Sequence, residues 1–164
     1  MKCLLHILPV AMALILGLAA CGDSSCYDNG SSLPLATIHL GEQQQTVSGI
    51  TIKGIGVPGD ELLVDSASIS EVYLPLRASV STTSFEFSRV VYQGAEPTLY
   101  HDTITFNYTP VEFFHSAECG AMYNFDIKQV TSTCHAIDSV VILTTHVTNS
   151  RTPAMRIYLT EFTL

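Results

Sequence analysis

The sequence contains no tryptophan, and charged residues make up only 13% of its 164 positions. Basic residues are especially scarce, with 7 lysines and arginines against 15 aspartates and glutamates. So few basic side chains cannot form a cationic stripe along a phosphate backbone, and we expect no nucleic-acid partner. Hydrophobic residues reach 47%. That proportion excludes a disordered acidic chain, because such chains combine low hydrophobicity with high charge.

Motifs of catalysis and metal binding are also missing. The patterns Gly-x-Ser-x-Gly, Ser-x-x-Lys, Cys-x-x-Cys and His-Glu-x-x-His do not occur. Cys134 and His135 are adjacent, so on a strand they would point to opposite faces. Asp60, Glu61 and Asp65 lack the alternating spacing of a calcium-binding loop. We therefore expect no metal site, no cofactor and no enzymatic activity.

The first 20 residues are typical of a secretory signal that ends at a lipidation site. Lys2 precedes an almost wholly apolar run, and Cys21 follows Leu18-Ala19-Ala20. This junction resembles the lipobox of bacterial lipoproteins, in which the Cys is acylated and becomes the first residue. The alternative is an uncleaved membrane anchor, which Pro9 and the shortness of the run disfavour. We predict a signal peptide at 1–20, a lipidated flexible tether at 21–34 and one domain at 35–164.

Loss of the signal would remove one basic residue, Lys2, and no acidic one. The mature chain would therefore be strongly acidic and repelled by an anionic membrane surface. A membrane partner is expected through the lipid anchor and not through charge.

From Leu35 onward, short runs with a period of two residues alternate with turn residues, a pattern that predicts β-strands. The continuous apolar run Val140-Val141-Ile142-Leu143 is typical of a strand that is buried on both faces. We predict an antiparallel β-sandwich, Ig-like in architecture, of about eight or nine strands. A small β-barrel is the alternative. The alternating runs lie at 36–40, 50–53, 72–76, 85–87, 104–108 and 123–127.

Five stretches of the chain carry a resemblance to a known family. They are Cys21 to Cys26, Leu74-Pro75-Leu76, Asp102-Thr103-Ile104 with Tyr108, Cys119-Gly120 with Tyr123, and Thr133 to Asp138. In this order they resemble a family of small cell-envelope lipoproteins of Bacteroides-type bacteria, which is classed as a domain of unknown function. The resemblance spans nearly the whole chain and implies a lipoprotein without a known activity. It offers no catalytic residue.

The resemblance also implies O-glycans, because secreted proteins of that bacterial group carry them at Asp-(Ser/Thr)-X, where X is Ala, Ile, Leu, Met, Thr or Val. Three segments match, which makes Ser66, Thr103 and Ser139 candidate sites. A strand that begins Asp-Thr-Ile is also ordinary β-strand sequence. A bulky glycan further requires an exposed position.

Three cysteines remain after the signal and the lipidation site are set aside, namely Cys26, Cys119 and Cys134. The compartment permits disulfides, and an odd number leaves one thiol over. The spacing leaves open a Cys26–Cys119 bridge, a Cys119–Cys134 bridge or none. In the family that the chain resembles, Cys26 and Cys119 look like the pair.

These features predict an outer-membrane lipoprotein that serves as a structural or protein-interaction module and docks on an envelope protein. The weak acidic pattern after Cys21 favours the periplasmic face over the cell surface. The alternative is a glycan-binding module for polysaccharide uptake. Without tryptophan, its aromatic platform would have to come from Tyr27, Tyr92, Tyr100 and Tyr123.

Overall fold

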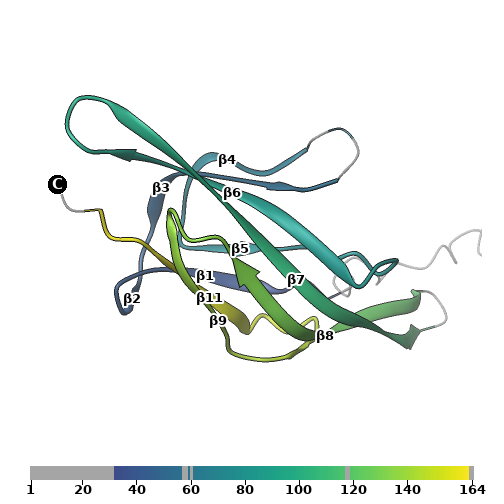
Figure 1. The fold of residues 1–164 in the computed structure, drawn as a ribbon. Coiled ribbons are helices and arrows are strands. Elements are labelled where there is room, and N and C mark those ends of the chain that lie inside the picture. The colour runs from purple at the N-terminus through teal and green to yellow at the C-terminus, as the bar shows by residue number, and fades with distance from the viewer. Residues whose placement is uncertain (1–31, 57–58, 60, 117–118, 163–164) are drawn as a thin grey trace, which may run out of the picture.

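The computed structural model describes residues 32–56, 59, 61–116 and 119–162, which form two β-sheets packed face to face (Figure 1). The predicted all-β sandwich is confirmed. The strands are β1 (Leu35–Leu40), β2 (Gln43–Gln44), β3 (Val47–Gly54), β4 (Leu62–Ile69), β5 (Glu71–Tyr73), β6 (Thr82–Tyr92), β7 (Pro97–Ser116), β8 (Gly120–Ser132), β9 (Ile137–Ile142), β10 (His146–Val147) and β11 (Pro153–Leu159).

The smaller sheet has the order β2-β1-β11-β9, with β5 also pairing with β1, and the larger has the order β10-β8-β7-β6-β3-β4. Strand pairing is antiparallel except between β1 and β11, which run parallel. This parallel pair, which joins the first and last long strands of the domain, differs from the antiparallel prediction. The described chain also has eleven strands instead of eight or nine. The strands that the sequence did not predict are β2 and β10, which have two residues each and are too short to show a period of two, and β4, which has eight residues.

The core lies between the sheets, where the alternating residues of the larger sheet point inward. Phe85 and Phe106 meet edge to face, with ring centroids 5.9 Å apart, and Tyr108 meets Phe125 in the same way at 5.4 Å. Burial of each of these aromatic side chains contributes on the order of 2–3 kcal/mol. The alternation predicted at 50–53, 85–87 and 104–108 is therefore confirmed.

Two strands of the smaller sheet differ from the sequence-based prediction. The alternation at 36–40 predicted a strand with one solvated face, but Thr37 and His39 of β1 are both buried. Their side chains contact each other, with Thr37 Oγ1 3.0 Å from His39 Nε2. Conversely, the prediction that 140–143 is buried on both faces is wrong, because β9 is an edge strand. Val141 and Leu143 are each more than two-fifths exposed.

The C-terminal segment after β11 fastens one sheet to the other. The ring of Phe162 stacks on Tyr100 with centroids 4.5 Å apart, and the Arg89 guanidinium lies 5.5 Å from the centre of the same ring. Arg89 also donates a hydrogen bond to the carbonyl oxygen of Thr160 at 3.0 Å. Because Arg89 and Tyr100 are cross-strand partners on β6 and β7, these contacts hold the chain end on the larger sheet.

The carboxylate of Asp102, on the central strand β7, is fully buried and organises the turn between β8 and β9. Its Oδ1 accepts hydrogen bonds from Thr133 Oγ1 at 2.7 Å, and from the backbone and ring nitrogens of His135 at 2.9 Å each. Its Oδ2 accepts the backbone N–H groups of Ala136 at 2.7 Å and Ile137 at 2.9 Å. Burial by itself would raise the pKa of Asp102, but these hydrogen bonds outweigh it and hold the pKa below its ordinary value.

We predict that Asp102→Asn lowers the free energy of unfolding by about 2–4 kcal/mol at neutral pH, because an amide NH2 would face donors that now have an acceptor. The pKa of Asp102 is lower in the folded than in the unfolded state. Its contribution is therefore complete above the unfolded pKa and is lost as the pH falls through the folded pKa. Urea unfolding should accordingly show a difference between wild type and variant that shrinks on acidification.

The matched control is Asp138→Asn, since Asp138 is an exposed aspartate of the following strand whose carboxylate accepts one hydrogen bond, from Ser139 Oγ at 3.1 Å. We expect this change to alter the unfolding free energy by less than about 0.5 kcal/mol. Equal losses in the two variants, or a difference that does not depend on pH, would contradict the role given to Asp102.

Candidate functional site

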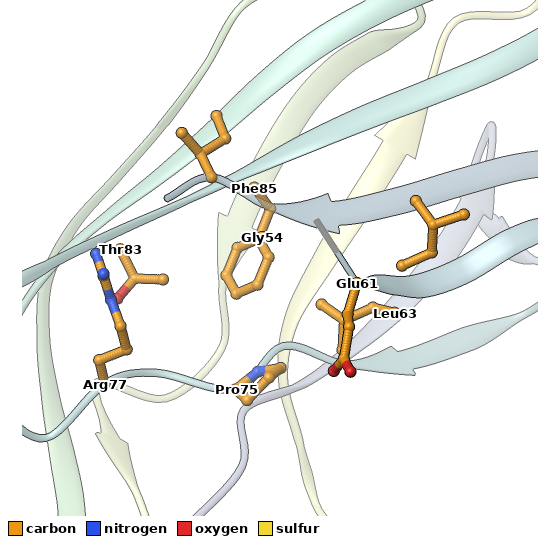
Figure 2. Close-up of a pocket in the computed structure, with 9 residues that line it drawn as sticks. Gly54, Glu61, Leu63, Pro75, Arg77, Thr83 and Phe85 are labelled. Atoms are coloured by element: carbon orange, nitrogen blue, oxygen red, sulfur yellow. The ribbon is translucent and has the colours of Figure 1, made fainter. Parts of the chain in front are cut away.

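A pocket of about 200 Å³ opens where β3 ends, β4 begins and the chain passes from β5 to β6. In Figure 2 the ring of Phe85 lies at its centre, with Arg77 and Thr83 on one side and Glu61 and Leu63 on the other. The sequence gives no local signal for this pocket, because its walls come from four separate segments. The lining residues are Gly54, Ile55, Glu61, Leu62, Leu63, Pro75, Arg77, Thr83 and Phe85.

One wall of the pocket is held by the buried hydroxyl of Tyr108. This hydroxyl donates to the carbonyl oxygen of Arg77 at 2.8 Å and accepts the backbone N–H of Arg77 at 3.0 Å. Thr83 Oγ1 lies 2.7 Å from the same oxygen. Because Tyr108 is fixed in the core against Phe125, these bonds set the position of the segment that follows β5.

The chemistry of the pocket is that of an apolar binding site. Its walls are mostly hydrocarbon, and the charged residues that line it are Glu61 and Arg77, both exposed. The Thr83 hydroxyl is already engaged with Tyr108, so it is not poised as a nucleophile. An apolar cavity of roughly 150 Å³ binds benzene, so this space suits one large apolar side chain or a ligand of similar size.

No cluster of three or more histidine, cysteine, aspartate or glutamate side chains that could hold a metal occurs in the part of the chain that the structure describes. His135 and His146 instead pair with carboxylates. His135 Nδ1 lies 2.9 Å from Asp102, and His146 Nδ1 lies 2.6 Å from Asp126. These are two-residue contacts within the sheets and turns.

The structure describes only some of the cysteines for which a role was predicted. Cys21 and Cys26 lie outside the described residues, whereas Cys119 comes directly before β8 and is engaged with a partner. Cys134 is a free, exposed thiol, which contradicts the Cys119–Cys134 alternative. The Cys26–Cys119 bridge stays a prediction.

The three candidate glycosylation sites lie in different settings. Ser66 is exposed on the edge strand β4, where its backbone N–H bonds Thr51 Oγ1 at 3.0 Å. Ser139 is half-buried on the edge strand β9. Thr103 is half-buried on a central strand, and the aspartate before it is wholly engaged in the turn described above. Glycosylation stays a prediction, and among the three the geometry favours Ser66.

The tyrosines suggested for glycan binding do not gather at one place in the described chain. Tyr92 and Tyr100 lie near the β6–β7 turn, and Tyr100 stacks on Phe162. Tyr123 lies near the beginning of β8, opposite Glu112 toward the other end of β7. Tyr27 falls outside the described residues. Of the described tyrosines, Tyr92, Tyr100 and Tyr123 do not line the apolar pocket.

Residues 49–159 match the model of a family described as a family of unknown function, DUF6452. The chain belongs to this family. No curated protein and no solved structure matches the chain. The predicted membership in a family of unknown function is thus confirmed, while the lipoprotein and cell-envelope character that the resemblance implied stays a prediction.

The structure brings together motifs on which the resemblance rests, although they lie far apart in the sequence. Asp102 binds the segment that begins at Thr133, and Tyr108 binds Arg77, the residue directly after Leu74-Pro75-Leu76. Tyr123, which follows Cys119-Gly120, accepts a backbone hydrogen bond at its carbonyl oxygen from Ser32 at 3.0 Å. Each of these contacts fixes a turn or a connection of the sandwich. None of the described segments forms a helix that could span a bilayer.

Proposed function

We propose that this DUF6452 protein is a lipid-anchored interaction module of the cell envelope, held in the outer membrane on its periplasmic face and without enzymatic activity. The observation that carries the proposal is Cys21 directly after Leu18-Ala19-Ala20, eleven positions before Ser32. Acylation of one Cys by two or three chains suffices for stable anchoring. At Ser32 the described domain begins, so such an anchor would leave the sandwich free to meet a partner.

The apolar pocket supports an interaction role more than a catalytic one. Exposed Ile55, Leu62 and Leu63 surround its opening, where an apolar side chain of a partner could be enclosed. Protein interfaces commonly depend on one such anchor in a desolvated pocket with a polar rim. Glu61 and Arg77 supply charges of both signs at that rim. We therefore propose an envelope protein that presents a large apolar side chain as the partner.

The anchor is tested with Cys21→Ala. Without the thiol there is no site for the acyl chains, so the variant should lose all incorporation of a fatty-acid probe and keep its full 164-residue length. Metabolic labelling and intact-mass measurement report the two effects. Cys134→Ala is the control, because Cys134 is a free thiol in the folded domain and its loss should leave labelling intact. Undiminished labelling of the Cys21→Ala protein would refute the anchor.

The interaction role is tested with a photo-crosslinking amino acid at Leu63, compared with the same group at Leu99 in intact cells. Both leucines are exposed, but Leu99 lies on β7 near the β6–β7 turn, away from the pocket. We expect a discrete protein adduct from position 63 that Leu62→Asp abolishes, since a charge there opposes entry of an apolar side chain. The same adducts from both positions, or none from position 63, would contradict docking at the pocket.

We also propose that Cys26 and Cys119 form the disulfide. Cys119 is engaged and Cys134 is free. The other cysteines are Cys3 in the signal, Cys21 at the anchor, and Cys26. In forming the bridge the two thiols would lose two protons and two electrons to a dithiol–disulfide oxidant of the envelope. Closing a loop of about 93 residues would stabilise the fold by on the order of 4–5 kcal/mol in the simplest entropy model.

Peptide mapping without reductant should yield one disulfide-linked peptide pair that contains Cys26 and Cys119. Cys26→Ser should lower the midpoint of thermal unfolding because the unfolded chain regains its loop entropy. Cys134→Ser should leave the midpoint unchanged, since that thiol is free and exposed. A linked pair that includes Cys134, or unlinked Cys26 in protein isolated from the envelope, would refute the pairing.

A further inference from the structure

The β7–β8 hairpin carries the most exposed large hydrophobic side chain of the described residues. Phe114 is 73% exposed, close to the end of β7 and opposite Ala121 of β8. In Figure 1 this hairpin extends beyond the other strands at the lower right. A phenylalanine that contributes so little to the core of its own domain is suited to contact something outside it.

The N-terminal end of the described chain lies beside the same hairpin. Ser32 donates its backbone N–H to the carbonyl oxygen of Tyr123 at 3.0 Å and its hydroxyl to Asn124 Oδ1 at 2.7 Å. Tyr123 is the cross-strand partner of Glu112, two residues before Phe114. The chain that leads back to Cys21 therefore departs next to the hairpin, where Leu33 is also 41% exposed.

The exposed apolar residues Ile55, Leu62 and Leu63 belong to the opening of the pocket at the β3–β4 edge of the larger sheet, and they are not part of the surface formed by Phe114 and Leu33. The β6–β7 hairpin carries Tyr92 and Leu99 and projects in the opposite direction, at the upper left of Figure 1. One end of the molecule thus combines exposed apolar side chains with the path to the predicted anchor.

We propose that the β7–β8 end is a membrane-contact surface, with Phe114 and Leu33 inserted at the surface of the bilayer that holds the acylated Cys21. This inference rests on the proposed lipid anchor. The eleven residues from Cys21 to Ser32 span at most about 36–40 Å when fully extended. With the proposed Cys26–Cys119 disulfide in place, the free tether is the five residues from Cys21 to Cys26, which span at most about 17–18 Å. Such a tether keeps the hairpin within reach of the membrane at high effective concentration.

The chemistry of the hairpin fits a lipid surface better than a charged one. Aromatic side chains favour the interfacial region of a bilayer. The chain is acidic, with Glu112 near the tip, so attraction to anionic headgroups would not hold it. Weak apolar contacts are sufficient here because the anchor already makes the encounter intramolecular. The contact should therefore form on zwitterionic lipid and persist at high salt.

The absence of tryptophan allows a direct test, because one introduced tryptophan is the sole such reporter in the chain. Phe114→Trp is compared with Tyr92→Trp, an exposed aromatic position at the opposite end. The acylated proteins are reconstituted into phosphatidylcholine vesicles with and without brominated acyl chains. We expect Trp emission from Phe114→Trp to shift to the blue and to be quenched by bromine, while that from Tyr92→Trp changes in neither respect. Leu33→Trp should behave as Phe114→Trp does.

The possible results distinguish failure of the proposed membrane contact from failure of the proposed lipid anchor. Acylated protein that floats with the vesicles but is quenched equally, or not at all, at both positions would overturn the membrane contact. A blue shift of Phe114→Trp without bromine quenching would indicate a protein partner or a second copy at this surface, and would also overturn it. Protein that carries no acyl chain and does not float would refute the proposed anchor and, with it, this inference.

Discussion

The arrangement of the two sheets depends on the hydrogen bonds that the buried carboxylate of Asp102 accepts. Asp102 lies in the central strand of the larger sheet and binds the backbone of Ala136 and Ile137, where the chain crosses into the smaller sheet. A charge taken out of water is tolerated only when its oxygens are fully bonded, and five donors meet that condition here. Because β9 starts at this turn and pairs with β11, the position of Asp102 also sets the edge of the smaller sheet.

Tyr108 likewise uses a buried polar group to bind backbone, in the segment that connects β5 to β6. Its hydroxyl satisfies both backbone groups of Arg77, and so fixes the segment that forms one wall of the apolar pocket. Among the described residues, Asp102 and Tyr108 of the motifs that resemble the family therefore hold turns and connections, and these motifs do not converge on a reactive centre. A family signature of this kind specifies a scaffold, and the function must then be sought on surfaces such as the pocket and the β7–β8 hairpin.

These two surfaces would serve different purposes in an anchored protein. The hairpin lies beside the N-terminal end of the described chain, whereas the pocket is formed at the far side of the larger sheet, near the edge strand β4. Contact of the hairpin with lipid would restrict how the domain turns on its tether. The pocket would then present a constant direction to a partner in the envelope, which lowers the orientational cost of binding.

The sequence by itself determined most of the long strands and the class of fold. Alternation at 50–53, 85–87 and 104–108 specifies which residues point inward, because the side chains of a strand alternate between its faces. It also carries the predicted anchor at Cys21, since acylation depends on local sequence. Tertiary structure decided which strands lie at the edges, so β1 is covered on both faces and the apolar run at 140–143 is not. Strand order, the role of Asp102 and the pocket arise from residues distant in the chain, and local periodicity contains no information about which of them meet.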